Sequence, residues 1–318
     1  MPDNERFPVL VIAGPTCSGK SALALELAVA FGGTVINADS MQVYRELRIL
    51  TARPSAADEA RAPHRLYGML SAAEPCSAAR WREMAVAAIG EARGAGRLPI
   101  ICGGTGLYLK ALIEGLSPLP DIPADIRASV RSRFATAKTE DIHAALREAD
   151  PEAAARLSAA DRQRQLRALE VIEATGRSIT DWQAAPPSGP PPGADFRSIL
   201  LMPPRKALYE ACDARFRRML AEGALDEVAH LRSLGLDAAL PAMKALGVSA
   251  LIRHLDGEIG LESAIAAAQQ ATRNYVKRQV TWFKRQFVAD FDLNEQFSEK
   301  FIEEIFSFVC KKGLTLSH

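Results

Sequence analysis

The segment from Gly14 to Ser21 constrains this chain more than any other. It matches the pattern G-x-x-x-x-G-K-[ST] and lies between an apolar run, Pro8–Ala13, and a helix-forming run, Ala22–Ala28. Strand, glycine-rich turn and helix in this order form a phosphate-binding loop, because the backbone N–H groups and the helix N-terminus converge on phosphate oxygens. The candidate binding residues are Gly14, Pro15, Thr16, Cys17, Ser18, Gly19, Lys20 and Ser21. We expect Lys20 to reach the terminal phosphate and Ser21 to hold Mg²⁺.

Three further segments are short, apolar and bordered by Gly or Pro: Thr34–Ala38, Leu98–Cys102 and Arg197–Met202. Such runs are typical of parallel strands that are covered on both faces. Helical patterns lie between them, for example over Ser77–Glu91. The order predicts an α/β fold, a P-loop NTPase-like parallel sheet with helices on both faces, whose ligands bind at the carboxyl ends of the strands.

The composition changes between Asp121 and Trp182. This stretch is rich in Ala, Arg, Glu and Asp at helical spacing, and it contains no convincing strand pattern. The Pro-rich segment 185–193 follows, and its composition is that of a stiff linker. We therefore expect a catalytic core from 1–120 and 194–290. A helical insertion over 121–193 and a C-terminal tail over 291–318 complete the predicted organisation.

Composition adds limits. The formal net charge of the 318 residues is +1, so binding of a nucleic acid would depend on a local basic patch. The five cysteines are scattered and form no C-x-x-C pair, which favours a reducing cytoplasm and argues against a structural zinc site. The apolar run near the N-terminus is too short for a signal peptide or a membrane span. We expect a cytoplasmic protein without membrane attachment.

A second motif, Asn37–Tyr44, follows the second expected strand and includes Asp39. A carboxylate there lies beside the phosphate loop, where it could take a proton from an acceptor nucleophile. It could equally cap the next turn or lie near Mg²⁺ without taking part in the reaction. A third motif, Gly103–Tyr108, follows another strand, and by itself it is a weak signal because Gly often only lets elements approach closely.

Together these motifs resemble the tRNA dimethylallyltransferase family, also called tRNA isopentenyltransferases, of bacterial type. The resemblance runs from Val9 to about Arg285. It rests on the three motifs above and on Thr51-Ala52-Arg53-Pro54, Pro63-His64, Gly115-Leu116-Ser117-Pro118, Arg164, Arg167-Ala168-Leu169-Glu170-Val171, Arg215-Phe216, Lys277-Arg278-Gln279 and Thr281-Trp282.

The resemblance implies transfer of a dimethylallyl group from its diphosphate to the exocyclic amine of the adenosine 3′ of the anticodon in tRNA. It implies four catalytic residues: Asp39 as the base, Lys20 and Arg215 on the leaving diphosphate, and Thr105. The phosphate loop would bind the donor, with Mg²⁺ on Ser21. Arg215 has the alternative of a surface helix residue, since only the resemblance distinguishes it from its arginine neighbours.

The same resemblance implies a set of tRNA-binding residues. They are Asp39, Ser40, Met41, Gln42, Thr105, Arg127, Gln163, Arg164, Gln165, Leu166, Arg167, Lys244, Lys277 and Arg278. The chain departs from the family pattern at Leu50, Arg53, Ala160, Val248 and Ser249. The last two replace an aromatic and a basic residue next to Lys244, which weakens the case for that contact with tRNA.

The segment Arg273–Phe287 can be interpreted without the family. At about 100° per residue, one arc is apolar, with Val276, Val280, Phe283 and Phe287. A neighbouring arc is basic, with Arg273, Lys277 and Lys284, and Arg278 and Arg285 lie further round. A solvated charged face is the default interpretation of such a stripe. No acidic residue lies between Arg273 and Arg285, however, and with the family match we expect contacts with the phosphates of an anticodon arm.

Three other functions fit part of this pattern. A small-molecule P-loop kinase would share the loop and Asp39, but it has no use for the insertion or the basic helix. A prenyltransferase for free adenine nucleotides would share the catalytic core without a second grip on RNA. A tRNA-binding protein without activity would leave the loop and Asp39 idle. The partners that the resemblance implies are tRNA and dimethylallyl diphosphate, and we expect a monomer.

Overall fold

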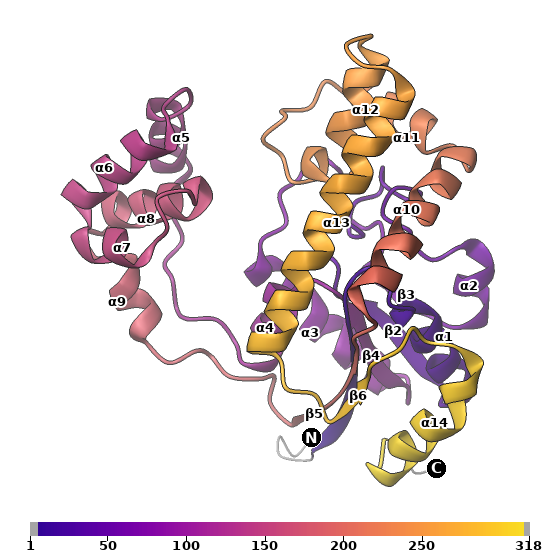
Figure 1. The fold of residues 1–318 in the computed structure, drawn as a ribbon. Helices are drawn as coiled ribbons and strands as arrows, with labels where there is room; N and C mark the ends of the chain where they lie inside the picture. The colour runs from indigo at the N-terminus through magenta and orange to yellow at the C-terminus, as the bar shows by residue number, and fades with distance from the viewer. Residues whose placement is uncertain (1–5, 315–318) are drawn as a thin grey trace. The chain divides into compact units, whose positions relative to one another are not determined.

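A computed structural model of the chain describes residues 6–314, and in this range six parallel strands form one sheet in the order β3-β2-β4-β1-β5-β6 (Figure 1). The strands are β1 Phe7–Ala13, β2 Gly33–Asn37, β3 His64–Arg65, β4 Leu98–Gly103, β5 Ala194–Leu201 and β6 Phe291–Leu293. The central strand β1 pairs with β4 on one side and β5 on the other. The carboxyl ends of all these strands therefore meet at one edge of the sheet.

Both faces of the sheet are covered by helices. In β1 the side chains of Val9 and Val11 enter one apolar cluster and those of Leu10 and Ile12 enter another, because successive residues of a strand point to opposite faces. The helices of the sheet-containing unit are α1 Lys20–Ala30, α2 Ala56–Arg61, α3 Ala78–Gly94, α4 Gly106–Ile113, α10 Arg205–Ala221, α11 Ala224–Ser233, α12 Val248–Leu255, α13 Leu261–Gln286 and α14 Ile302–Lys311, with 3₁₀ turns at Ala242–Lys244 and Glu299–Phe301. The predicted fold class is confirmed.

The expected strands correspond to β1, β2, β4 and β5, whereas no sequence pattern indicated β3 or β6. Each has at most three residues, too few for a periodic pattern to develop. The missed strand β6 changes the description of the C-terminal segment most, because β6 pairs with β5 in the range that was expected to be a tail. Helix α14 then adds Ile305 and Val309 to the apolar cluster on one face of the sheet. In the described range the segment after residue 290 is thus part of the core unit.

The helical insertion is a second compact unit, Glu114–Pro190. Its helices are α5 Ala124–Arg133, α6 Thr139–Ala149, α7 Pro151–Arg156, α8 Arg162–Thr175 and α9 Ile179–Ala184. Ile142, Leu146, Ala168 and Leu169 belong to an apolar cluster of its own. The unit begins before residue 121 and ends at residue 190, since Gly193 already accepts the Phe7 N–H at the start of β1.

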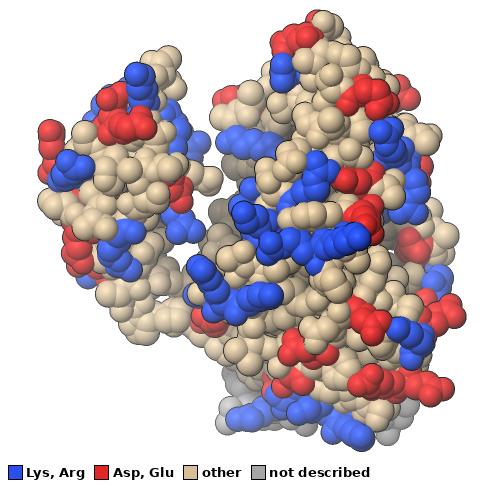
Figure 2. Space-filling model, in the orientation of Figure 1, with Lys and Arg blue, Asp and Glu red and all other residues tan. Residues whose placement is uncertain are grey.

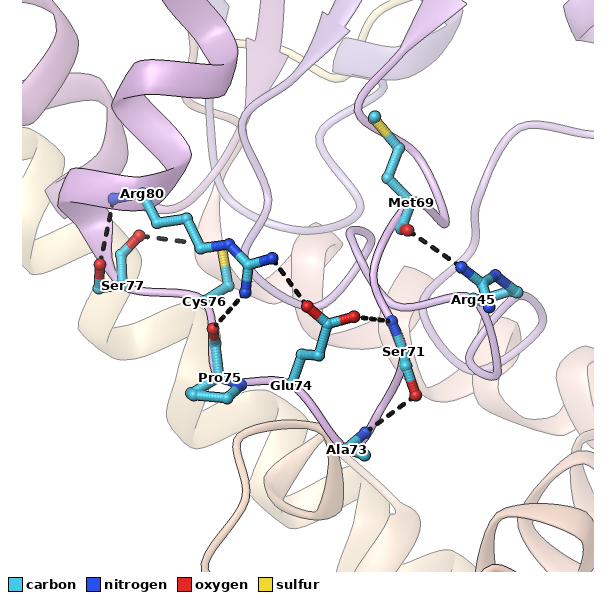
Figure 3. Close-up of polar contacts among 9 residues, drawn as sticks. All are labelled: Arg45, Met69, Ser71, Ala73, Glu74, Pro75, Cys76, Ser77 and Arg80. Carbon is cyan, nitrogen blue, oxygen red and sulfur yellow. Dashed lines mark hydrogen bonds and ion pairs between the residues drawn. The ribbon is translucent and has the colours of Figure 1, made fainter. Parts of the chain in front are cut away.

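The segment that leads into α3 is fixed by polar contacts (Figure 3). The Arg80 guanidinium lies 2.8 Å from the Glu74 carboxylate and donates to the Pro75 carbonyl at 3.0 Å. The Ser77 hydroxyl accepts the Arg80 N–H and caps the helix. These contacts define where α3 begins, and so the position of Trp81 in its first turn. In the described part of the chain no helix is long and apolar enough to cross a membrane.

Candidate active site

The phosphate loop connects the buried end of β1 to α1. Gly19 precedes the helix with φ 91°, a conformation that favours glycine, and Cys17 adopts the same left-handed region with φ 65°. The Lys20 ammonium folds back over the loop and donates to the Pro15 carbonyl at 3.2 Å. The N–H groups at the start of α1 and the Lys20 charge make a site for a phosphate group.

Two observations fit a bound phosphate with its metal ion. The Ser18 hydroxyl is buried within the loop and has no hydrogen-bond partner among residues 6–314, as expected for a group that faces a ligand. The Ser21 side chain is exposed in the first turn of α1, and residues 6–314 hold no group of three or more His, Cys, Asp and Glu residues that could bind a metal alone. Such a sparse set suits Mg²⁺, which usually keeps several waters and takes its other ligands from substrate phosphates.

Thr16 is the point where two helices reach the phosphate loop. Arg215 of α10 donates to the Thr16 hydroxyl at 2.6 Å, and Gln279 of α13 accepts the Thr16 N–H at 2.9 Å. The half-buried Arg215 is therefore not a free surface residue. Its guanidinium lies beside the loop, as the family resemblance implied.

Gln279 also joins the phosphate loop to the glycine turn after β4. Its Nε2 donates to the Gly104 carbonyl at 2.8 Å, so one buried amide connects the loops that follow β1 and β4. A Cβ on Gly104 would lie 2.8 Å from the Gly14 carbonyl oxygen and 2.4 Å from Gln279 Nε2. The third motif therefore needs its second glycine for close approach of the two loops.

Asp39 lies in a tight turn after β2. Its Oδ1 accepts the Met41 N–H at 2.9 Å, while its own N–H donates to the Asn37 side chain at 2.8 Å. No hydrogen bond to its Oδ2 occurs in the range 6–314. The carboxylate thus caps a turn, which was one of the open alternatives, and still has one oxygen available to a substrate.

The Asn37 side chain stabilises this turn. Its side chain is buried and its Nδ2 donates to the carbonyls of Leu66 and Asp39, while its backbone carbonyl accepts the indole N–H of Trp81 at 2.9 Å. The Trp81 ring is stacked on Tyr108 with ring centroids 4.4 Å apart. Asn37, at the end of β2, therefore connects the turn of Asp39 to Trp81 of α3 and, through the stacked rings, to Tyr108 of α4.

Ser40 and Thr105 join the turn after β2 to the turn after β4. The Ser40 N–H donates to Thr105 Oγ1 at 3.0 Å, and the Thr105 hydroxyl is 3.4 Å from Ser40 Oγ. Tyr275 of α13 lies beside Thr105 and near Asp39. Burial raises the pKa of Tyr275, and the negative charge of Asp39 adds to the increase. The Tyr275 hydroxyl therefore stays neutral beside Asp39 and Thr105.

Met41 and Gln42 follow in the same segment. Met41 is half-buried, and its side chain packs against the core of the sheet. The Gln42 amide donates to the carbonyls of Thr51 and Ala52 at 2.8 and 3.0 Å, which leaves its Oε1 as the atom able to contact a base. Gln42 therefore also holds the segment that contains Arg53.

Helix α13 presents a basic surface beside this site. Lys277, Arg278, Lys284 and Arg285 are exposed, and Figure 2 shows basic side chains gathered where α13 runs in Figure 1. A hollow of about 550 Å³ is lined by Lys277, Arg278, Arg285 and the half-buried Trp282, among others. Positive charge beside an aromatic ring is a combination suited to RNA.

Arg273 does not belong to this basic surface, contrary to the expectation. Its guanidinium contacts both carboxylate oxygens of Asp213 at 2.7 and 2.9 Å and also donates to Gln270. The sequence around Arg273 holds no acidic residue, and the partner comes from α10. Pairing with Asp213 removes this cation from the set available to phosphates.

The candidate RNA-binding residues of the insertion belong to the other unit and are described within it. Arg127, Gln163 and Arg164 are exposed, and Arg164 pairs with Asp161. Arg167 contacts Glu170, and Leu166 packs on the unit's apolar cluster. Gln165 is fully buried and donates to the Ser158 carbonyl, which argues against a side-chain contact with RNA. In the sheet-containing unit, Lys244 is exposed and the neighbouring Val248 is buried.

The chain was compared with known families and proteins. A family model described as IPP transferase matches residues 42–286, and a model described as Isopentenyl transferase matches 7–72. The chain belongs to the IPP transferase family. It is 57% identical over 282 residues to the tRNA dimethylallyltransferase of Rhodospirillum centenum, covering 89% of this chain and 90% of that protein. With the tRNA dimethylallyltransferase of Parvibaculum lavamentivorans it shares 53% identity over 308 residues, covering 97% and 98%.

Solved structures agree with the family. The tRNA isopentenylpyrophosphate transferase of Bacillus halodurans is similar with a TM-score of 0.68 and 32% identity, and the match covers 97% of both chains. A eukaryotic dimethylallyltransferase solved as it acts on tRNA matches with a TM-score of 0.77 and 25% identity, covering 96% of this chain and 80% of that one.

Three residues of the chain were missed as site residues from the sequence: Asn37, Gln279 and Tyr275. Gln279 and Asn37 are buried polar residues that bridge backbone groups. A polar side chain on an otherwise apolar arc of α13 was the available signal for Gln279. Tyr275 gave no such signal, because its contact with Thr105 is visible only in three dimensions.

Proposed function

We propose that this chain transfers a dimethylallyl group from dimethylallyl diphosphate to N6 of the adenosine 3′ of the anticodon in tRNA and releases diphosphate. The observation that carries the proposal is the buried side chain of Gln279, which joins the phosphate loop to the turn of Gly104. Thr105 lies in the same turn and accepts the N–H of Ser40, the residue next to Asp39. A donor diphosphate and an acceptor amine would thus meet at one edge of the sheet.

In the proposed reaction the N6–C1 bond forms, the C1–O bond of the donor breaks, and a proton leaves N6. The amine is a poor nucleophile because its lone pair is delocalised into the adenine ring. The free Oδ2 of Asp39 accepts the proton, while Oδ1 keeps the carboxylate oriented through the Met41 N–H.

The leaving diphosphate gains negative charge as the bond breaks. That charge would be stabilised by Lys20, Arg215 and the loop N–H groups. The Arg215 guanidinium is already oriented, because it donates to the Thr16 hydroxyl. Ser21 would hold Mg²⁺, which neutralises phosphate charge when it is bound. Thr105, which accepts the Ser40 N–H, and the neighbouring Tyr275 would orient the acceptor.

The target base must leave the anticodon stack to reach Asp39. Ser40, Met41 and Gln42 would contact the base, and Lys277 and Arg278 would hold the phosphates beside it. The insertion would offer Arg127, Gln163, Arg164 and Arg167 as a second grip on the RNA, with Lys244 from the other unit.

The direct test mixes the protein, Mg²⁺, labelled dimethylallyl diphosphate and bulk tRNA, followed by digestion to nucleosides. We expect labelled N6-prenyladenosine from tRNA and little label on AMP at equal concentration. Preference for AMP over an anticodon stem-loop would replace tRNA by free nucleotides as the acceptor. Transfer of phosphate from ATP to a small molecule, with no prenylated product, would indicate a kinase instead.

A further inference from the structure

Two cysteine thiols meet at the phosphate loop. Cys17 of the loop packs on a small apolar cluster formed by Leu208, Cys212, Val276 and Val280. Cys212 belongs to the cluster against which Cys17 packs, each is the group with the largest effect on the pKa of the other, and both cysteines are free. Cys17 belongs to the candidate phosphate loop, whereas Cys212 has none of the roles assigned above.

Helix α10 explains why the pair is close. Cys212 and Arg215 are three residues apart and so lie on one face of the helix, where they contact two consecutive residues of the loop, Cys17 and Thr16. Gln296 donates to the Cys17 carbonyl at 3.1 Å from the other side. The backbone at Cys17 is thus held between α10 and the segment after β6.

The surroundings of Cys17 favour a reactive thiolate. The hydrogen bond from Cys212 is the largest cause that lowers the pKa of Cys17, to about 6, and the charges of Arg215 and Lys20 act in the same direction while burial opposes them. The pKa of Cys212 is raised, first by this hydrogen bond and then by burial. Cys17 is half-buried, whereas Cys212 is buried, so only Cys17 faces a soluble oxidant.

We propose that Cys17 and Cys212 form a thiol oxidation site, at which a peroxide converts the contacting pair into a disulfide that disables the phosphate loop. The Cys17 thiolate attacks the peroxide, the O–O bond breaks, and Cys17 sulfenic acid forms while the peroxide is reduced to water. The Cys212 thiol then attacks the Cys17 sulfur, the S–O bond breaks and water leaves. In total two thiols lose two electrons and two protons to one peroxide.

A disulfide would displace the loop. An S–S bond of about 2.05 Å is much shorter than a contact between two thiols, so Cys17 must move toward α10. The N–H groups of Cys17 and its neighbours then no longer converge on the phosphate. A shift of about 1 Å in a positioning group can lower a reaction rate about 10²-fold. The expected loss of transfer rests on the proposed function, whereas formation of the disulfide does not.

The first experiment tests the bond itself. The full chain is treated with hydrogen peroxide, blocked with N-ethylmaleimide and digested with trypsin without reduction, and the peptides are mapped by mass spectrometry. We expect a linked pair of peptides, 7–20 with 207–215, which dithiothreitol separates. Oxidation of Cys17 without this linked pair, or linkage of Cys17 to another cysteine, would overturn the proposal.

The second experiment separates the bond from simple oxidation of Cys17. Cys212→Ser keeps a hydroxyl in place of the thiol and should leave the activity of the reduced protein unchanged. After peroxide treatment the wild type should lose transfer activity about 10²-fold and recover with dithiothreitol. The variant should instead retain Cys17 sulfenic acid, trapped by dimedone, and progress to forms that dithiothreitol does not restore.

Equal loss and equal recovery in the two proteins would show that Cys212 has no role. Cys310→Ser is the matched control, because this exposed thiol lies far along the chain and should not alter either result. A reduced wild type without transfer activity would contradict the proposed function, and the peptide map would still decide whether the disulfide forms.

Discussion

The two oxygens of the Asp39 carboxylate have different environments. One accepts the Met41 N–H, and the other has no hydrogen bond in the part of the chain that the structure describes. Asn37 fixes the backbone below, so the carboxylate is oriented before any substrate arrives. The sequence left capping and proton transfer as alternatives for Asp39. The geometry is compatible with both, because each uses a different oxygen.

Asp39→Asn should therefore slow the reaction while both substrates still bind. The amide keeps an oxygen for the Met41 N–H but accepts a proton poorly, so we expect a loss of about 10²–10⁴-fold in single-turnover rate. Asp39→Ala is the comparison, since it removes the turn contact as well and should also lower stability. Unchanged chemistry with a collapse of tRNA affinity would make Asp39 a binding residue.

Lys20→Ala and Ser21→Ala test the other half of the site. Each removes a group that would stabilise the leaving diphosphate, which typically costs about 10²–10³-fold in rate. Steady-state transfer at several donor concentrations measures the effect, with Lys206→Ala as the control because that side chain on α10 is 89% exposed. Near-wild-type transfer by Lys20→Ala would mean that the donor binds elsewhere.

At the scale of elements, α13 combines three surfaces in one helix. Val276 and Phe283 face the apolar clusters, Gln279 reaches the two loops, and Lys277 and Arg278 are exposed. The apolar and basic arcs could be predicted from periodicity, which is a local property. The contacts of Gln279 and the ion pair of Arg273 could not, because their partners lie far along the chain.

The contacts of the segment after β6 could not be predicted from the sequence either. The Phe297 N–H donates to the Ser18 carbonyl, and a Cβ on Gly19 would lie 2.8 Å from the Phe297 side chain. Gly19 is thus needed both for its left-handed backbone and for this close approach. The motif predicted a glycine there for the phosphate, but nothing in the sequence indicated that the C-terminal segment supports the loop.

Gln279→Leu should weaken donor binding through the loop. The variant leaves the Thr16 N–H and the Gly104 carbonyl without their partner, at about 1–3 kcal/mol for each buried group. We expect a lower free energy of unfolding in urea and a higher KM for the donor. Gln269→Leu is matched to it on the same helix, since Gln269 bonds only to the Asp213 carbonyl among the described residues. Equal changes in donor KM for both variants would contradict a specific role of Gln279.

At the scale of the whole molecule, the formal net charge is only +1, but the basic side chains are unevenly distributed over the surface. Composition alone predicted only that any affinity for nucleic acid must be local. Helical periodicity then predicted where such a patch would lie, and exposed Lys277, Arg278, Lys284 and Arg285 occupy it. Which cations remain free depended on tertiary pairing, and Asp213 removed Arg273 from the set.

Reversing the charge at Lys277 and Arg278 together should raise the KM for tRNA strongly. Each lost phosphate contact should also reduce the slope of log affinity against log salt by about 0.7–0.9, because fewer counterions are released. The double variant Lys311→Glu/Lys312→Glu is the matched control, since it changes an adjacent exposed pair on or next to α14 by the same net charge. Donor KM should hardly change in either protein. If both double variants alter tRNA binding alike, net charge and not the α13 surface guides the RNA. If neither does so at physiological salt, the acceptor does not need this surface, and free adenine nucleotides become the better candidate.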